Sequence, residues 1–337
     1  MNADILKRIM RAIADGSQDD LDVLAEKVVE SERESGHTKL ANDLAGILRR
    51  GKRKTNGTHA PAEADHTFRE LPQSRRTREA LVSVVPHDTL EHHMVLPKEV
   101  EERFARIERE YAARERLGAY GLRPRKTVLL YGPPGCGKSL GAKRLAWNTG
   151  LSLMKVRFDA LLSSYFGESA ANLRSVFGAA KERPCLLLLD ECDFIARSRG
   201  NSKDIGEASR IVNALLQLME EFDAPGLLVA TTNLENALDE AIFRRFDDVF
   251  LVPLPGLEEI ERLLRFTLSS VTVSKSVQWE TAIASLQGQP AAQVVKAAQD
   301  AAKAAVLGGG KVIEDSHLRT AIADLKRESR SGPRESP

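Results

Sequence analysis

The stretch that decides the fold runs from Val128 to Ser139 and reads VLLYGPPGCGKS. An apolar run leads into a glycine-rich loop of the form GxxxxGK[ST], and a helical pattern follows it. Glycines let the backbone N–H groups of such a loop turn inward around phosphate, and the next helix offers its positive N-terminus. We expect Lys138 to neutralise the β- and γ-phosphates and the Ser139 hydroxyl to ligate Mg²⁺. The residues expected to contact ATP in this stretch are Gly132, Pro133, Pro134, Gly135, Cys136, Gly137, Lys138, Ser139 and Leu140.

Two adjacent carboxylates, Asp190 and Glu191, end the apolar run of residues 186–189. Burying such charge at the end of a strand is costly unless a partner compensates it, and a magnesium ion is such a partner. We therefore predict that Asp190 helps to hold Mg²⁺ and ATP. Glu191 is placed to take a proton from the attacking water.

The next apolar run, residues 227–230, ends in Thr231, Thr232 and Asn233. The amide of Asn233 has two interpretations. Either it hydrogen-bonds the γ-phosphate or orients the water, or it only caps the end of a strand. The residues alone leave both interpretations open.

Short apolar runs alternate with helical patterns between residues 127 and 252. These runs are 127–131, 153–158, 186–190, 227–231 and 249–252. In one segment between them, Leu173, Val176, Phe177 and Ala180 recur at the i, i+3, i+4, i+7 spacing of a helix face. Fully apolar strands separated by helices predict a parallel sheet covered on both faces. The predicted fold is therefore an α/β, doubly wound P-loop NTPase domain.

The rest of the chain divides into further modules. Apolar residues recur every four positions near the N-terminus, whereas the pattern after Pro255 is wholly helical. The predicted modules are an N-terminal helical module at 1–50, a flexible linker at 51–85, the ATPase domain at 86–254, a small all-α domain at 255–328 and a disordered tail at 329–337.

Composition and charge narrow the possible functions. The 337 residues have a formal net charge of +1, which gives no general attraction to nucleic acid or to an anionic membrane. No apolar run approaches the roughly 20 residues of a membrane span, and the start of the sequence lacks the pattern of a signal peptide. Cys136, Cys185 and Cys192 form no CxxC pair, so we expect buried thiols in a reducing cytoplasm.

Together, these motifs resemble the AAA family, the protein-remodelling clade of the AAA+ ATPases. The resemblance covers residues 94–307. It rests on GLRP at 121–124, GPPGCGKS at 132–139, LLLLDE at 186–191, ATTN at 230–233 and DEAIFRRFD at 239–247. The segment SSYFGES at 163–169 is similar to single-ring bacterial members of the family.

The resemblance implies roles for residues on the nucleotide side. Asn233 would be the sensor-1 residue, and Arg244 and Arg245 would be arginine fingers that reach the γ-phosphate of the neighbouring subunit. Two guanidinium groups suit charge that is spread over the oxygens of a transferring phosphate. Gly288 and Ala291 fall where the small helical domain of the family meets the nucleotide.

The resemblance also implies a contact with polypeptide and leaves one contact open. Tyr165, Phe166 and Gly167 match the aromatic–hydrophobic–glycine pattern of a pore loop. The family's usual adenine-side segment is missing, and residues 92–97 stand in its place as HHMVLP. The adenine contacts are therefore not predicted.

The predicted function is that of a Mg²⁺-dependent, homo-hexameric ring ATPase that unfolds or remodels protein substrates. One alternative is a switch whose ATP-dependent assembly regulates a partner, such as a protease acting in trans. Another is a DNA-acting ATPase. Tyr165, Phe166 and Gly167 favour polypeptide, and the near-zero net charge gives the DNA alternative no support.

Overall fold

The computed structural model of the protein describes residues 71–74, 77–162, 168–193, 205–233, 243–310 and 312–330. The chain divides between Glu70 and Leu71, and the described residues all belong to the second part. The predicted helical module at 1–50 and the predicted pore-loop residues Tyr165, Phe166 and Gly167 lie outside the described residues.

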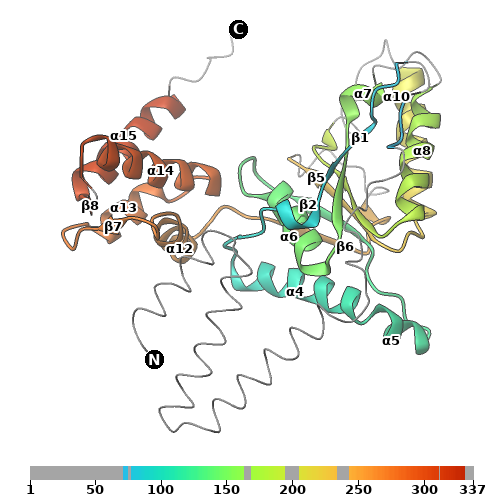
Figure 1. The fold of residues 1–337 in the computed structure, drawn as a ribbon, viewed down its shortest axis with the longest axis horizontal. Helices are drawn as coiled ribbons and strands as arrows, with labels where there is room; N and C mark the ends of the chain where they lie inside the picture. Colours follow the sequence, from blue (N-terminus) through green and yellow to red (C-terminus); the bar gives the residue numbers. More distant parts are fainter. Residues whose placement is uncertain are drawn as a thin grey trace, which may run out of the picture. The chain divides into compact units, whose positions relative to one another are not determined.

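A six-stranded sheet with the strand order β1-β3-β4-β5-β2-β6 forms the centre of the fold (Figure 1). Its strands are β1 (Val82–Val85), β2 (Thr127–Tyr131), β3 (Ser152–Val156), β4 (Cys185–Leu189), β5 (Leu227–Thr232) and β6 (Asp248–Leu251). Neighbouring strands are parallel, except that β1 runs antiparallel to β3. This arrangement confirms the predicted α/β fold with a parallel-dominated sheet.

Helices cover both faces of this sheet because its inner strands are apolar on both sides. The helices of this part of the chain are η1 (His87–Thr89), α4 (Lys98–Ala112), α5 (Arg114–Ala119), α6 (Lys138–Thr149), α7 (Phe158–Leu162), α8 (Ser169–Glu182) and α10 (Ile205–Glu220), of which η1 and α5 bury no residue. Alternate residues of β4, such as Leu186 and Leu188, join one buried cluster with α4 and α6. Helices α8 and α10 lie on the other side of the strands (Figure 1).

Strand β1 corrects the predicted linker at 51–85. The strand lies at the edge of the sheet and pairs in register from Val82–Val156 to Val85–Leu153. Leu81 and Val82 are buried there, whereas Val84 and Val85 are only partly buried. Four residues with one exposed position give no clear periodicity, so the sequence pattern missed the strand. The linker prediction is therefore wrong at its C-terminal end.

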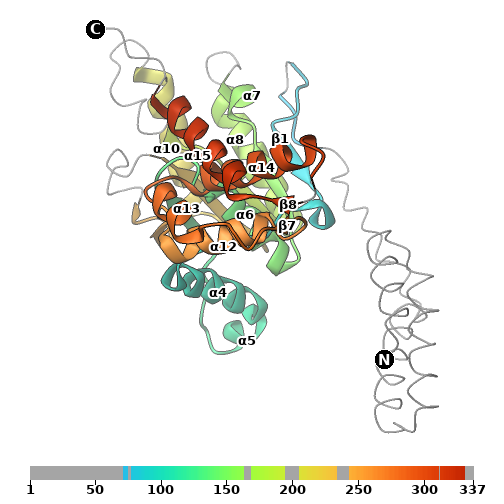
Figure 2. The ribbon, with the colours of Figure 1, turned by 90° about the vertical axis from the view of Figure 1, so that its left-hand side faces the viewer.

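The C-terminal region is mainly helical, as Figure 2 shows. Its helices are α12 (Leu257–Thr267), α13 (Trp279–Leu286), α14 (Ala291–Leu307) and α15 (Asp315–Arg330). They enclose a hydrophobic cluster of their own, which includes Ile260, Leu264 and Leu286.

Two details of this region correct the prediction. The region is not all-α, because β7 (Thr272–Val273) and β8 (Val312–Ile313) form a short parallel pair. Helix α15 also continues two residues into the predicted disordered tail, since it ends at Arg330. Within the described ranges, no helix has both the length and the apolar character that crossing a membrane requires.

Candidate functional site

Glycines shape the loop of residues 132–137 that joins β2 to α6. Gly132, Gly135 and Gly137 have φ values of 141°, 76° and 94°, which residues with a side chain rarely adopt. A Cβ atom at Gly132 would lie 2.4 Å from the backbone oxygen of Val252. Helix α6 begins at Lys138 without a side-chain cap from any described residue. Its first N–H groups therefore remain available to an anion.

Lys138 folds back into this loop. It is buried, and its Nζ donates hydrogen bonds to the carbonyl oxygens of Gly132 and Pro133, each at 2.8 Å. Burial lowers the pKa of Lys138 more than nearby acidic groups, Asp190 and Glu191 among them, raise it. The ammonium thus lies inside the loop, where phosphate oxygens would replace the two carbonyls as acceptors.

Asp190 accepts three hydrogen bonds at the carboxyl edge of the sheet. Its Oδ1 accepts one from Ser139 Oγ and one from Thr231 Oγ1, each at 2.7 Å. Its Oδ2 accepts one from Lys155 Nζ at 2.6 Å. Burial alone would raise the pKa of Asp190, but these three bonds outweigh burial and lower it. The carboxylate is therefore ionised near neutral pH.

Strand register explains why these side chains meet. Lys155 of β3 is paired with Leu188 of β4, and side chains two apart on a strand share a face. Lys155 and Asp190 consequently lie on the same face, and Thr231 comes from the adjacent strand β5. Helix α6 covers this face, and its first turn carries Ser139.

This set of groups fits a magnesium ion. Mg²⁺ prefers oxygen ligands and is usually held by one or two protein groups together with waters and substrate phosphates. The Ser139 hydroxyl and the Asp190 carboxylate supply two such oxygens side by side. The carboxylate already carries a cationic group, the Lys155 ammonium. Ser139 and Asp190 would therefore hold the ion, as the sequence predicts.

Glu191 follows Asp190 in an unusual backbone conformation. Its φ is 57°, in the left-handed region that non-glycine residues seldom occupy. Its backbone N–H donates to Thr231 Oγ1 at 2.9 Å, and its side chain is exposed. Strain of this kind concentrates at functional sites. The Glu191 side chain is thus exposed to solvent just beyond the carboxyl end of β4.

Asn233 has a local partner that the sequence interpretation did not identify. Its side-chain Nδ2 and its backbone N donate to the two oxygens of Asp193, at 3.2 and 2.9 Å. Thr232 Oγ1 also donates to Asp193, at 2.7 Å. Asp193 therefore fixes the end of β5 and the orientation of the Asn233 amide.

A cavity of about 1070 Å³ opens beside the phosphate loop. Its wall includes residues 90–95, the loop residues Gly135 to Gly137, and parts of α12 and α14. Ala292 N donates to Gly135 O at 2.9 Å, so the start of α14 contacts the loop directly. Ala291 lines the cavity, whereas Gly288, with φ of 79°, lies in the turn before α14. The volume is ample for a nucleoside.

Comparison with known proteins shows which family the chain belongs to. The family described as "ATPase family associated with various cellular activities (AAA)" has a model that matches residues 128–254. The chain is also 31% identical to an uncharacterized AAA family ATPase of Sinorhizobium fredii, y4kL, over 99% of its own length and 98% of that protein. The chain belongs to the AAA family of ATPases. The phosphate loop lies within the matched AAA domain, which implies nucleotide binding, and the cavity opens beside this loop.

The phosphate loop lies at the carboxyl ends of the parallel strands, whereas Arg244 and Arg245 of this AAA ATPase lie at the amino ends. They precede β6, which runs parallel to β2, whereas the loop follows the carboxyl end of β2. Five residues of β2 separate the two edges, a distance of about 16 Å at 3.3 Å per residue. An arginine side chain does not span this distance, so neither residue reaches the nucleotide site of its own chain.

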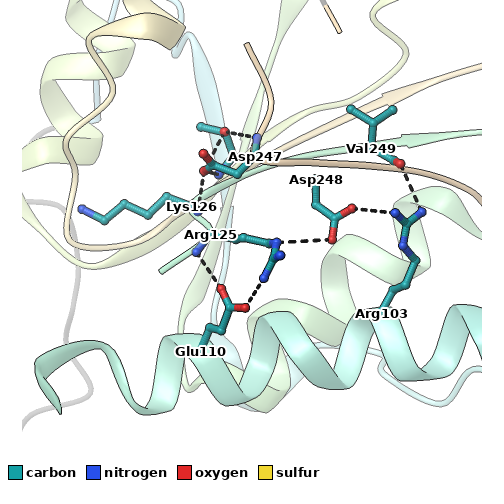
Figure 3. A network of polar contacts seen from close by, with 8 residues as sticks. Arg103, Glu110, Arg125, Lys126, Asp247, Asp248 and Val249 are labelled. Carbon is teal, nitrogen blue, oxygen red and sulfur yellow. Dashed lines mark hydrogen bonds and ion pairs between the residues drawn. The ribbon is translucent and has the colours of Figure 1, made fainter. Parts of the chain in front are cut away.

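A polar network fixes the turn that carries these arginines (Figure 3). Asp247 Oδ2 accepts hydrogen bonds from the backbone N–H groups of Lys126 and Thr127, at 2.8 and 2.9 Å. Arg245 Nε forms an ion pair with Glu220 of α10 at 2.8 Å. The turn is thereby anchored to the amino end of β2 and to α10.

A second layer of this network reaches helix α4 (Figure 3). Asp248 pairs with Arg103 at 3.1 Å and with Arg125 at 3.7 Å, and Arg125 also pairs with Glu110. Arg103 donates in addition to the carbonyl oxygen of Val249 at 3.1 Å. Helix α4 therefore holds the start of β6 through Arg103, and this contact supports the turn that carries Arg244 and Arg245.

Proposed function

We propose that this AAA ATPase binds ATP with Mg²⁺, hydrolyses it in a cytoplasmic homo-hexameric ring, and uses the turnover to unfold or remodel proteins. The observation that carries the hydrolysis proposal is the hydrogen bond between Ser139 and Asp190 beside the phosphate loop, with the exposed Glu191 next to Asp190 in the chain. The buried free thiols of Cys136, Cys185 and Cys192 suit a reducing compartment.

Each residue has a distinct role in the proposed reaction. Lys138 neutralises charge on the transferring phosphate, and the N–H groups at the start of α6 bind its oxygens. Bound Mg²⁺ would neutralise further charge on the β- and γ-phosphates. Glu191 accepts the proton of the attacking water, and the Asn233 amide, oriented by Asp193, positions that water.

The location of Arg244 and Arg245 supports a site that two subunits share. Because both residues lie at the sheet edge opposite their own nucleotide site, we assign their action to the γ-phosphate of a neighbour. Such a contact joins two different surfaces of identical chains. Repeating it closes a ring when the rotation between subunits allows.

The proposal of a protein substrate rests on the resemblance at residues 163–169 alone. An aromatic and a hydrophobic side chain at the ring centre, Tyr165 and Phe166, would grip an extended chain by packing, without reading its sequence. A switch that regulates a partner protein would not need this grip.

The test uses ATP turnover in the presence of an unfolded polypeptide such as denatured casein. We expect the polypeptide to stimulate turnover, and Phe166→Ala to abolish this stimulation while basal turnover stays near the parent level. Tyr120→Ala is the matched control, because Tyr120 is an aromatic residue that is 80% exposed outside the nucleotide site. Unchanged stimulation in Phe166→Ala, or none in the parent, would replace the unfoldase proposal with the switch.

A further inference from the structure

Lys155 is the charged residue of strand β3, whose other residues are apolar or, in the case of Ser152, small. Its Nζ lies 2.6 Å from Asp190 Oδ2. The two partners differ in exposure: the Lys155 side chain is 46% exposed, and the Asp190 side chain is 7% exposed. A half-exposed lysine thus reaches inward to neutralise a buried carboxylate in the nucleotide site.

The position of this ammonium is the important feature. One oxygen of Asp190 accepts a hydrogen bond from Ser139, and the other accepts one from Lys155. Ser139 and Asp190 are also the two groups that fit Mg²⁺. A divalent cation bound beside Ser139 would lie within a few ångströms of the Lys155 ammonium. Two cations at that distance in a partly buried site repel each other strongly. The Asp190 carboxylate therefore cannot bind Mg²⁺ and the Lys155 ammonium equally well at the same time.

We propose that Lys155 is a positioning residue that holds Asp190 when magnesium nucleotide is absent and must release it when Mg²⁺ binds. This inference rests on the proposed function, in which Asp190 helps to hold the ion. The stem of a lysine is flexible, and its exposed position gives the ammonium space to swing into solvent. The cost of that release lowers the affinity for Mg²⁺.

The consequence is that Mg²⁺ binding depends on nucleotide. An ion alone must displace Lys155 in exchange for one carboxylate and one hydroxyl. An ion that arrives with nucleotide gains phosphate oxygens as further ligands. Lys155 thereby compensates the negative charge of Asp190 while the site is empty. It also disfavours the binding of Mg²⁺ without nucleotide.

The experiment measures the Mg²⁺ concentration that gives half-maximal enhancement of the binding of a fluorescent ADP analogue, for the parent and for variants. We expect Lys155→Met to lower this concentration about tenfold, toward the low end of typical coupling between sites. Lys155→Arg keeps the charge and should stay near the parent value. Lys126→Met is the control for net charge, because Lys126 pairs with Asp223 and directly precedes the amino end of β2, at the other end of the strand from the phosphate loop.

Thermal unfolding provides a second readout. Lys155→Met should melt below the parent without ligand, because Asp190 loses a partner, and should recover most of that loss with Mg²⁺ and ADP. A purely structural ion pair would instead lower the melting temperature equally in both conditions. An unchanged or increased Mg²⁺ requirement in Lys155→Met overturns the inference. Binding of the analogue that is independent of Mg²⁺ in the parent would overturn the proposed magnesium site as well.

Discussion

Replacing Gly132 with alanine tests whether the phosphate loop depends on close contact with the end of β6. The new Cβ would lie 2.4 Å from the backbone oxygen of Val252, and the residue has φ of 141°. The unfavourable backbone conformation costs about 1–3 kcal/mol, and forcing an extra methyl group into packed surroundings costs a further 1–3 kcal/mol or so. The neighbour is backbone and cannot rotate away. We therefore expect Gly132→Ala to lose about 3 kcal/mol of unfolding free energy.

Thermal unfolding measures this loss directly. For a domain of this size, about 3 kcal/mol corresponds to a melting temperature lowered by roughly 6–12 °C. Gly178→Ala in α8 is the matched control, because a Cβ there meets nothing within 4 Å. A helix gains about 0.5–1 kcal/mol from that change. If Gly132→Ala melts at the parent temperature, the assigned contact between the loop and β6 is wrong.

Two further predictions concern assembly and pH. Mixing Arg244→Ala/Arg245→Ala subunits with Lys138→Ala subunits should restore part of the ATP turnover that each lacks alone, because mixed interfaces regain one complete site; no recovery in assembled mixtures would contradict action in trans. The pKa of Glu101 is lowered, first by its hydrogen bond from Arg144, so this ion pair stabilises the fold above the ordinary carboxyl range and loses that effect as the pH falls. The melting temperatures of the parent and Glu101→Gln should therefore differ at pH 7 and converge only as the pH falls below the ordinary carboxyl pKa of about 4. A difference in melting temperature that stays constant with pH would contradict a stabilising Glu101–Arg144 ion pair.

The parts of the fold that the sequence predicts well are those with strong apolar patterns. The strand prediction at 186–190 differs from β4 by one residue at each end, because a fully apolar run beside a helix pattern has few alternatives. Strand β1 was missed because an edge strand of four residues carries little pattern. The order of the strands depends on how the crossovers pack, which periodicity does not reveal.

Sequence also identifies the residues of the nucleotide site better than their partners. Lys138, Ser139 and Asp190 belong to motifs whose spacing reflects the chemistry of phosphate and magnesium. Lys155 and Asp193 belong to no such motif. A single lysine in an apolar strand gives no hint that its ammonium reaches Asp190. The carboxylate of Asp193, three residues after Asp190, was a usable signal that the interpretation did not consider.

In the proposed reaction, Glu191 is the base of an ATP-hydrolysing site whose phosphates are held by other residues. The most direct test measures phosphate release and ATP binding together in Glu191→Gln, with Lys138→Ala alongside. Because Gln keeps the size of the side chain but cannot accept the proton, we expect turnover to fall at least about a hundredfold while ATP binding stays near the parent level. Lys138→Ala should weaken binding itself, because a phosphate charge loses its partner. Turnover by Glu191→Gln at the parent rate would contradict the account.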